Sequence, residues 1–102
     1  MISHVQQLAE VFRLLGDPSR LQVLDQCRGG PIPVGRIAAN TGLSPSLVSH
    51  HLRLLRAARI VRAERRGREI HYSLADHHID RVLQDLTEHY AEPDHDREMA
   101  PS

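Results

Sequence analysis

Apolar residues in the first part of the chain recur at helical spacing. Leu8, Phe12 and Leu15 lie three or four positions apart, so residues 3–15 are predicted to form an amphipathic helix that ends at Gly16. Asp17 then offers a capping side chain, and Pro18 occupies the first helical position, where its missing N–H costs nothing. A second helix is predicted from there to about residue 27.

The middle of the chain predicts two more helices joined by a tight turn. A short helix from Val34 ends at Thr41 and Gly42, and Ser44 with Pro45 repeats the cap-plus-proline start of a longer helix. The apolar residues expected to point inward from this longer helix are Leu47, Val48, Leu52 and Leu55.

The apolar period then changes from about four residues to two. Residues 60–64 and 70–74 alternate apolar and polar positions around an Arg-Arg-Gly-Arg turn at 65–68, which predicts a β-hairpin with an arginine-rich tip. Asp76 is expected to cap a last helix that Pro93 closes. Its apolar stripe consists of Ile79, Val82, Leu83, Leu86 and Tyr90.

This order of elements predicts a mainly α-helical fold with a β-hairpin wing, a dimeric winged helix-turn-helix. Ala38 is small where two helices must approach closely, Gly42 suits the left-handed backbone of the turn, and Val48 packs inside. Residues 1–93 are expected to form the DNA-binding and dimerisation domain, and residues 94–102 a polar, disordered tail.

Length and composition set the class of protein. A chain of 102 residues has room for one domain, and its modest core would gain from the surface buried in a homodimer. No apolar stretch approaches the length of a membrane span, so no membrane partner is expected. Cys27 is the only cysteine, which excludes an internal disulfide and fits a cytoplasmic protein.

Charge is unevenly distributed, although the formal net charge is zero. Residues 53–68 hold seven arginines against one acid, and residues 76–96 hold seven acids against one arginine. A basic middle suits a polyanion, and an acidic end that also carries histidines suits a cation. The alternative is two solvated helix faces of opposite sign.

The basic middle predicts a double-stranded DNA partner. Short polar side chains at the start of a helix reach base edges or phosphates in the major groove, and arginines at the wing tip contact phosphates or the minor groove. The candidate DNA-binding residues are Ser44, Ser46, Ser49, His50, His51, Arg53, Arg65, Arg66 and Arg68. A protein-interaction domain with solubilising arginines is the alternative.

The last helix carries two pairs of metal ligands. Asp76 and His78 stand at its start, and His89 and Glu92 near its end, separated by about 16 Å at ~1.5 Å per residue. One chain could not hold one ion with both pairs, but two antiparallel helices of a dimer would bring opposite pairs together. Two imidazoles with two carboxylates suit tetrahedral zinc and also cobalt. Taken singly, Asp76 is more often a helix cap, and His78 and Glu92 are more often surface residues. His89 adjoins the apolar stripe, so its alternative role is that of an interface residue.

The sequence resembles the ArsR/SmtB family of bacterial metal-sensing repressors from Leu8 to Glu92. The telling stretches are FRLLGDPSRLQVL (12–24), LSPSLVSHHLRLLRAARIV (43–61), RRGREIHYSL (65–74) and DHHIDRVLQDLTEHYAE (76–92). The resemblance implies zinc bound by Asp76, His78, His89 and Glu92, a dimer formed by the first and last helices, and DNA contact by the helix of Ser46, Ser49 and His50.

The sequence departs from the family's pattern in two ways that limit which metals are expected to bind. The helix PVGRIAANTG lacks the Cys-x-Cys of arsenic and cadmium sensors, so thiolate sensing is not expected. Nickel and cobalt sensors recruit further ligands from their tails. Here His95, His4 and His77 are the candidates for such extra ligands, and the alternative is that they are solvated.

The expected function is therefore a non-enzymatic transcriptional repressor. Its metal-free homodimer binds an imperfect inverted repeat in operator DNA and leaves it when zinc, or alternatively cobalt or nickel, binds. One rival is a repressor of the same family without a metal, triggered through Cys27. The other is a small zinc hydrolase, but the chain has no H-E-x-x-H motif, and no small organic substrate is expected.

Overall fold

The computed structural model describes residues 3–92 of the chain. The elements in chain order are α1 (His4–Leu15), α2 (Pro18–Gln26), a 3-10 turn η1 (Cys27–Gly29), β1 (Ile32–Pro33), α3 (Val34–Thr41), α4 (Pro45–Ala57), β2 (Val61–Arg66), β3 (Glu69–Leu74) and α5 (His77–Ala91). The predicted mainly α-helical, winged helix-turn-helix fold is confirmed. The predicted tail, residues 94–102, and His95 lie outside the described residues.

The helix starts follow the capping chemistry of the sequence. Ser3 caps α1 and exchanges reciprocal hydrogen bonds with Gln6, which makes a full capping box. Asp17, Ser44 and Asp76 accept backbone N–H bonds at the starts of α2, α4 and α5. These caps satisfy N–H groups that have no partner within their own helix.

The sheet has one strand more than the hairpin predicted from the sequence. Its order is β1-β3-β2 with antiparallel pairing throughout, and Ile32 lies opposite Tyr72. The pattern missed β1 because a strand of two residues that includes Pro33 has no alternation to detect. The tip is also tighter than predicted, since β2 runs to Arg66 and only Gly67 and Arg68 form the turn. Gly67 has φ 64°, as the first position of a type II′ turn requires.

The hydrophobic core lies between α2, α3, α4 and the base of the sheet. Its fully buried members include Val23, Leu24, Ile37, Val48, Leu52, Leu55 and Ile60. Leu47, expected inside, is only half-buried. None of the helices within residues 3–92 is long and apolar enough to cross a membrane.

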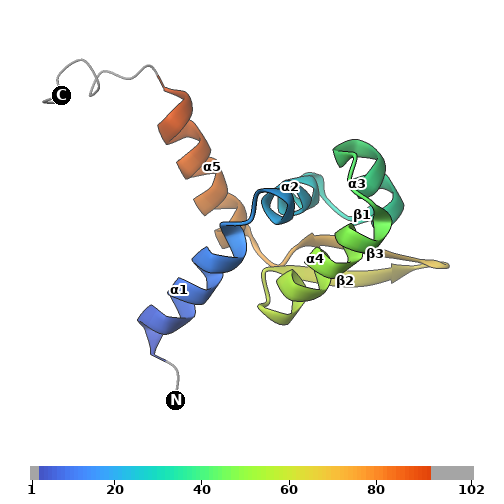
Figure 1. The fold of residues 1–102 in the computed structure, drawn as a ribbon, viewed down its shortest axis with the longest axis horizontal. Helices are drawn as coiled ribbons and strands as arrows, with labels where there is room; N and C mark the ends of the chain where they lie inside the picture. The colour runs from blue at the N-terminus through green and yellow to red at the C-terminus, as the bar shows by residue number, and fades with distance from the viewer. Residues whose placement is uncertain (1–2, 93–102) are drawn as a thin grey trace, which may run out of the picture.

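Helices α1 and α5 extend from one end of this body, and the β2–β3 hairpin extends from the other (Figure 1). In the single chain several of their apolar residues face solvent: Val5 is 74% exposed and Tyr90 is 83% exposed. Helix α5 has no buried residue. Two apolar stripes of this kind are typical of helices that a partner covers.

Candidate nucleic-acid interface and metal-ligand positions

Helices α3 and α4 form the helix-turn-helix. Gly42 ends α3 in the left-handed conformation, with φ 77°, and its N–H donates to the Ala38 carbonyl at 2.9 Å. A side chain would be strained at this φ, which explains the glycine. The Ser44 hydroxyl then accepts from the Leu47 N–H at 3.1 Å, and α4 begins at Pro45, three residues after Gly42. Only residues 42–44 therefore separate the two helices.

The outward face of α4 presents the predicted polar residues. Ser44, Ser46, His50 and Arg53 are exposed, and Ser49 is half-buried. Ser44 and Ser46 lie at the start of α4, where the positive end of the helix dipole favours an anion. This end of α4 is therefore suited to phosphate and to the acceptor edges of bases.

His51 does not share that face, which corrects the sequence prediction. Its side chain is only 3% exposed, and Nε2 lies 2.7 Å from the hydroxyl of Ser19 on α2. Burial lowers the pKa of the His51 imidazole below its usual value, which favours the neutral ring. An internal, neutral side chain is not available to contact DNA. The signal was present, because His51 lies three residues from Val48 and four from Leu55, on the buried stripe.

The wing carries the predicted arginines on its surface. Arg65, Arg66 and Arg68 are all exposed. Arg66 donates from Nε to Glu64 at 3.0 Å, an exposed ion pair that leaves most of its donors free. The hairpin thus holds a cluster of guanidinium groups away from the body of the protein.

The four predicted metal ligands all lie on or next to α5, and all are exposed. Asp76 caps the helix by accepting the N–H groups of His78 and Ile79 at 2.9 and 3.2 Å, both at Oδ1. Its Oδ2 receives no hydrogen bond from residues 3–92. His89 and Glu92 stand at the other end of the helix. The described part of a single chain brings no three histidine, cysteine or acidic side chains together as a metal site.

The further histidines differ in position. The His77 ring packs against that of His78, with centroids 4.1 Å apart. His4 is exposed at the first position of α1. Only His77 therefore lies beside one of the predicted ligand pairs in the described part of the chain.

Sequence reasoning missed a residue that joins α5 to the rest of the chain through hydrogen bonds. Arg28, in η1, donates from Nε to Asp80 at 2.9 Å and from Nη2 to Gln84 at 2.7 Å. Within residues 3–92 these are the side-chain hydrogen bonds between α5 and other elements. No local pattern could reveal a contact between residues 52 positions apart.

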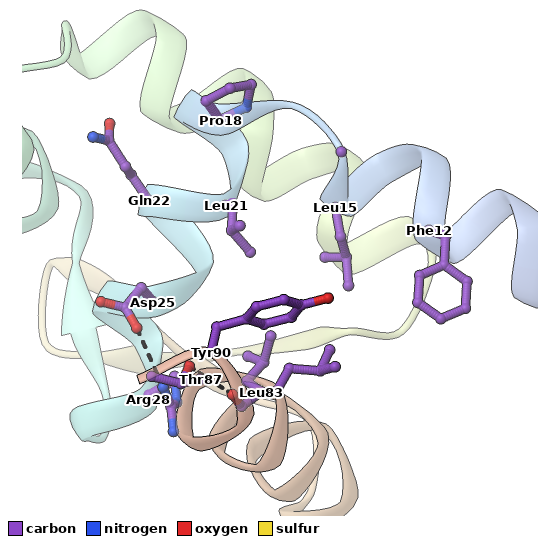
Figure 2. Close-up of a pocket in the computed structure, with 12 residues that line it drawn as sticks. Phe12, Leu15, Pro18, Leu21, Gln22, Asp25, Arg28, Leu83, Thr87 and Tyr90 are labelled. Carbon is purple, nitrogen blue, oxygen red and sulfur yellow. Dashed lines mark hydrogen bonds and ion pairs between the residues drawn. The ribbon is translucent and has the colours of Figure 1, made fainter. Parts of the chain in front are cut away.

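An apolar groove lies between α1, α2 and α5 (Figure 2). Its volume is about 800 Å³. In Figure 2, Tyr90 and Leu83 of α5 point across the groove toward Leu15 and Leu21. Phe12 stands at its edge, and Asp25 with Arg28 forms a polar rim. The groove continues the exposed apolar stripes of α1 and α5.

Comparison with known proteins agrees with this geometry. Residues 17–63 match the family described as "Bacterial regulatory protein, arsR family". A transcriptional repressor SmtB homolog from Synechocystis sp. is 40% identical over 93 residues, which cover 91% of this chain and 70% of the relative. The chain belongs to the ArsR/SmtB family of transcriptional repressors.

Two further proteins are similar to this ArsR/SmtB chain. The HTH-type transcriptional regulator NmtR of Mycobacterium tuberculosis is 43% identical over 83 residues, covering 81% of this chain and 69% of NmtR. The solution structure of a homodimeric winged helix-turn-helix DNA-binding domain from Mycobacterium bovis superposes with a TM-score of 0.75 at 30% identity. That superposition covers 86% of this chain and 84% of the other.

The family match accounts for the helix-turn-helix region of the molecule. The family match covers α2, α3, α4 and the start of β2, and the relatives are described as transcriptional regulators and repressors. The Mycobacterium bovis relative is described as homodimeric.

Proposed function

We propose that this protein is a metal-responsive repressor, which binds operator DNA as a metal-free homodimer and leaves it when zinc binds between the subunits. The observation that carries the proposal is the layout of α5. Two exposed ligand pairs stand at opposite ends of a helix whose apolar stripe is uncovered. If two α5 helices pack antiparallel, each end pair of one chain meets the opposite pair of its partner.

The donor set fits a divalent transition metal. Asp76 and His78 of one subunit with His89 and Glu92 of the other would provide two imidazole nitrogens and two carboxylates, which suits tetrahedral zinc or cobalt. Asp76 can both cap α5 and ligate, because its cap bonds use Oδ1 alone. Nickel would require more ligands, for which His77 and His4, and His95 outside the described residues, are the candidates.

The DNA partner we propose is an imperfect inverted repeat, with one α4 helix in each half-site. Ser46, Ser49, His50 and Arg53 would contact bases and phosphates, with Ser44 at the helix start. Arg65, Arg66 and Arg68 would bind the flanking backbone or minor groove. Because operator DNA is the target, we place the protein in the cytoplasm.

Metal would act by linkage between the two sites. An ion that joins α5 of one subunit to α5 of the other favours one dimer shape, and the repressor releases DNA if that shape misaligns the two α4 helices. The metal then lowers DNA affinity by the same factor by which DNA lowers metal affinity. The coupling free energy of such a pair of sites is typically about 1–3 kcal/mol.

Cobalt titration followed by visible absorption tests the proposed metal site. Intense tetrahedral bands that saturate at about one ion per chain and disappear on adding zinc are expected. His89→Gln should abolish them, whereas His71→Gln, which removes a wing histidine, should leave them unchanged. Weak octahedral bands and strong competition by nickel would replace zinc with nickel or cobalt as the effector.

DNA release tests the other half of the proposal. Fluorescence anisotropy with a labelled inverted repeat should show tight binding without metal and weaker binding with zinc. A protein that binds cobalt yet holds its operator equally well with and without metal would not be a metal-responsive repressor.

A further inference from the structure

We propose that His51 is a positioning residue of the recognition helix: through the hydroxyl of Ser19 it locks α4 to the corner between α1 and α2. This inference deepens the proposed DNA binding and rests on it. The lock sets the orientation in which α4 leaves the dimerisation helices, and hence the angle between the two recognition helices of a dimer.

The lock is a short chain of hydrogen bonds inside the protein. Ser19 Oγ donates to Asp17 Oδ1 at 2.9 Å, and His51 Nε2 lies 2.7 Å from the same oxygen. Because the serine proton points to Asp17, the serine oxygen must accept from Nε2–H. The imidazole is therefore the neutral tautomer that carries its proton on Nε2.

The other ring nitrogen is a constraint on this arrangement. His51 Nδ1 is buried and has no hydrogen-bond partner among residues 3–92. An unprotonated Nδ1 tolerates this position, but a proton on Nδ1 would have no hydrogen-bond acceptor. The site therefore holds one protonation state and one tautomer of the ring.

The Asp17 corner connects the lock to the dimerisation end of the molecule. Asp17 Oδ1 also accepts the Arg20 N–H at 3.1 Å, which caps α2. The Arg20 side chain is buried, and its Nε donates to the Leu14 carbonyl at the end of α1 at 2.6 Å. An unbroken set of polar contacts thus runs from α1 through the corner to α4.

The lock adds direction to the restraint that the apolar core already provides. Val23 and Leu24 on α2 and Val48 and Leu52 on α4 are fully buried, but apolar burial is non-directional. A hydrogen bond weakens steeply when its angle changes. The lock therefore resists rotation of α4 about its axis, which would move Ser46 and His50 relative to a DNA groove.

Acid should open the lock. Burial lowers the pKa of His51, and Arg20 and the neighbouring His50 act in the same direction, against the carboxylate of Asp17. The neutral ring is therefore present above the ordinary histidine pKa, and the lock is lost as pH falls through the lower folded-state value. Operator affinity and folding stability should both decrease on the acid side.

Three variants separate positioning from general stability. His51→Phe removes the donor, Ser19→Ala removes one oxygen, and His51→Gln retains an N–H donor that does not titrate. In anisotropy titrations at about pH 7.5 we expect the first two to weaken operator binding about tenfold, and His51→Gln to bind within about threefold of wild type. The double variant Ser19→Ala/His51→Phe should lose no more operator affinity than either single variant, since both substitutions remove the same hydrogen bond.

The acid response gives a second readout that a merely structural role would not move. Wild type should lose operator affinity as the pH falls below the ordinary histidine pKa and through the lower folded-state pKa of His51, and His51→Gln should lose less. His71→Gln, which changes a partly buried wing histidine, should retain the wild-type response. Full operator affinity in folded Ser19→Ala, or additive losses in the double variant, would overturn the inference.

A measurement without DNA keeps this test separate from the proposed function. Nitrogen-15 shifts of the His51 ring should show Nε2 protonated and Nδ1 bare, and Ser19→Ala should change them together with the amide signals of α4. A ring protonated on Nδ1 would overturn the lock even if operator binding is normal. Wild-type protein with the expected ring signals and no affinity for inverted repeats would instead refute the proposed DNA target.

Discussion

Arg28 and Asp80 join two elements that are far apart in the sequence, with Nε donating to Oδ1 at 2.9 Å. Arg28 follows α2, which packs on the recognition helix α4, and Asp80 lies one turn after Asp76 on α5. The Arg28 side chain is largely buried, whereas that of Asp80 is half-exposed. The pair therefore connects the proposed metal-binding helix directly to the DNA-binding body.

Replacing Arg28 should loosen α5. Arg28→Met keeps much of the apolar stem but removes the bonds to Asp80 and Gln84, and we expect a loss of about 1 kcal/mol in unfolding free energy after allowing for solvent screening. Urea unfolding measures the loss, and hydrogen exchange should locate it in α5. Arg81→Met, which changes an exposed arginine of the same helix, should cost much less; equal losses would contradict the prediction.

Asp76 should serve two functions that substitution can separate. Asn accepts the cap bonds of α5 but lacks the carboxylate charge, so Asp76→Asn should keep helix stability and lose metal affinity. Asp76→Ala should lose both, with about 1 kcal/mol of stability. Urea unfolding and cobalt absorption provide the two measurements. Strong cobalt binding by Asp76→Ala would remove Asp76 from the ligand set.

The wing arginines should contribute to DNA affinity through phosphate charge. Each phosphate contact contributes about −0.9 to the slope of log affinity against log salt concentration. Arg65→Ala and Arg68→Ala should each make that slope shallower by up to about this amount, if each guanidinium neutralises one phosphate. Arg81→Ala, on α5, is the matched control. Slopes identical to wild type would mean that the wing does not contact the backbone.

Arg59 should be a source of backbone strain between α4 and β2. Its φ of 62° makes it the positive-φ residue other than glycine in the described chain. Arg59→Gly should therefore increase the unfolding free energy by about 1 kcal/mol. Arg59→Ala removes the same side chain but keeps the strain, so it should not stabilise. If both variants behave alike, the gain comes from the side chain rather than the backbone.

Cys27 should be unreactive in the folded protein. Its side chain is buried, and burial raises the pKa of the thiol to about 12, so the nucleophilic thiolate is scarce at neutral pH. Iodoacetamide should label native protein slowly and urea-unfolded protein fast, as mass spectrometry can follow. Rapid native labelling that releases DNA would favour the rival, a thiol-triggered repressor.

Local chemistry determined most of what the sequence could predict. The caps at Asp17, Ser44 and Asp76 and the turn at Gly42 depend on neighbouring residues, so their positions could be found from the pattern. Predicting that His51 is buried required weighing it against the adjacent His50, because two successive helical residues point about 100° apart. Its bond to Ser19 joins residues 32 positions apart and was out of reach.

The sequence could predict the residue types and the spacing of the candidate metal ligands, but not how they assemble into a site. Asp76, His78, His89 and Glu92 are separated within one chain, and their proposed assembly depends on a second subunit. Helix packing between chains is not encoded in the period of one helix, so the metal site stays a prediction. The apolar stripes of α1 and α5 are the part of that assembly that the sequence could indicate.

The short strand β1 has a consequence for how copies of this protein can associate. It forms one edge of the sheet, is only two residues long, and ends in Pro33, which has no N–H to donate to another strand. The opposite edge, β2, carries Arg62, Arg65 and Arg66, which would repel the same edge of a second wing. These two edge strands therefore disfavour a continuous intermolecular sheet. Two wings brought near each other on adjacent half-sites would remain independent arms, and crowding of the protein along DNA would not seed fibrils through its strands.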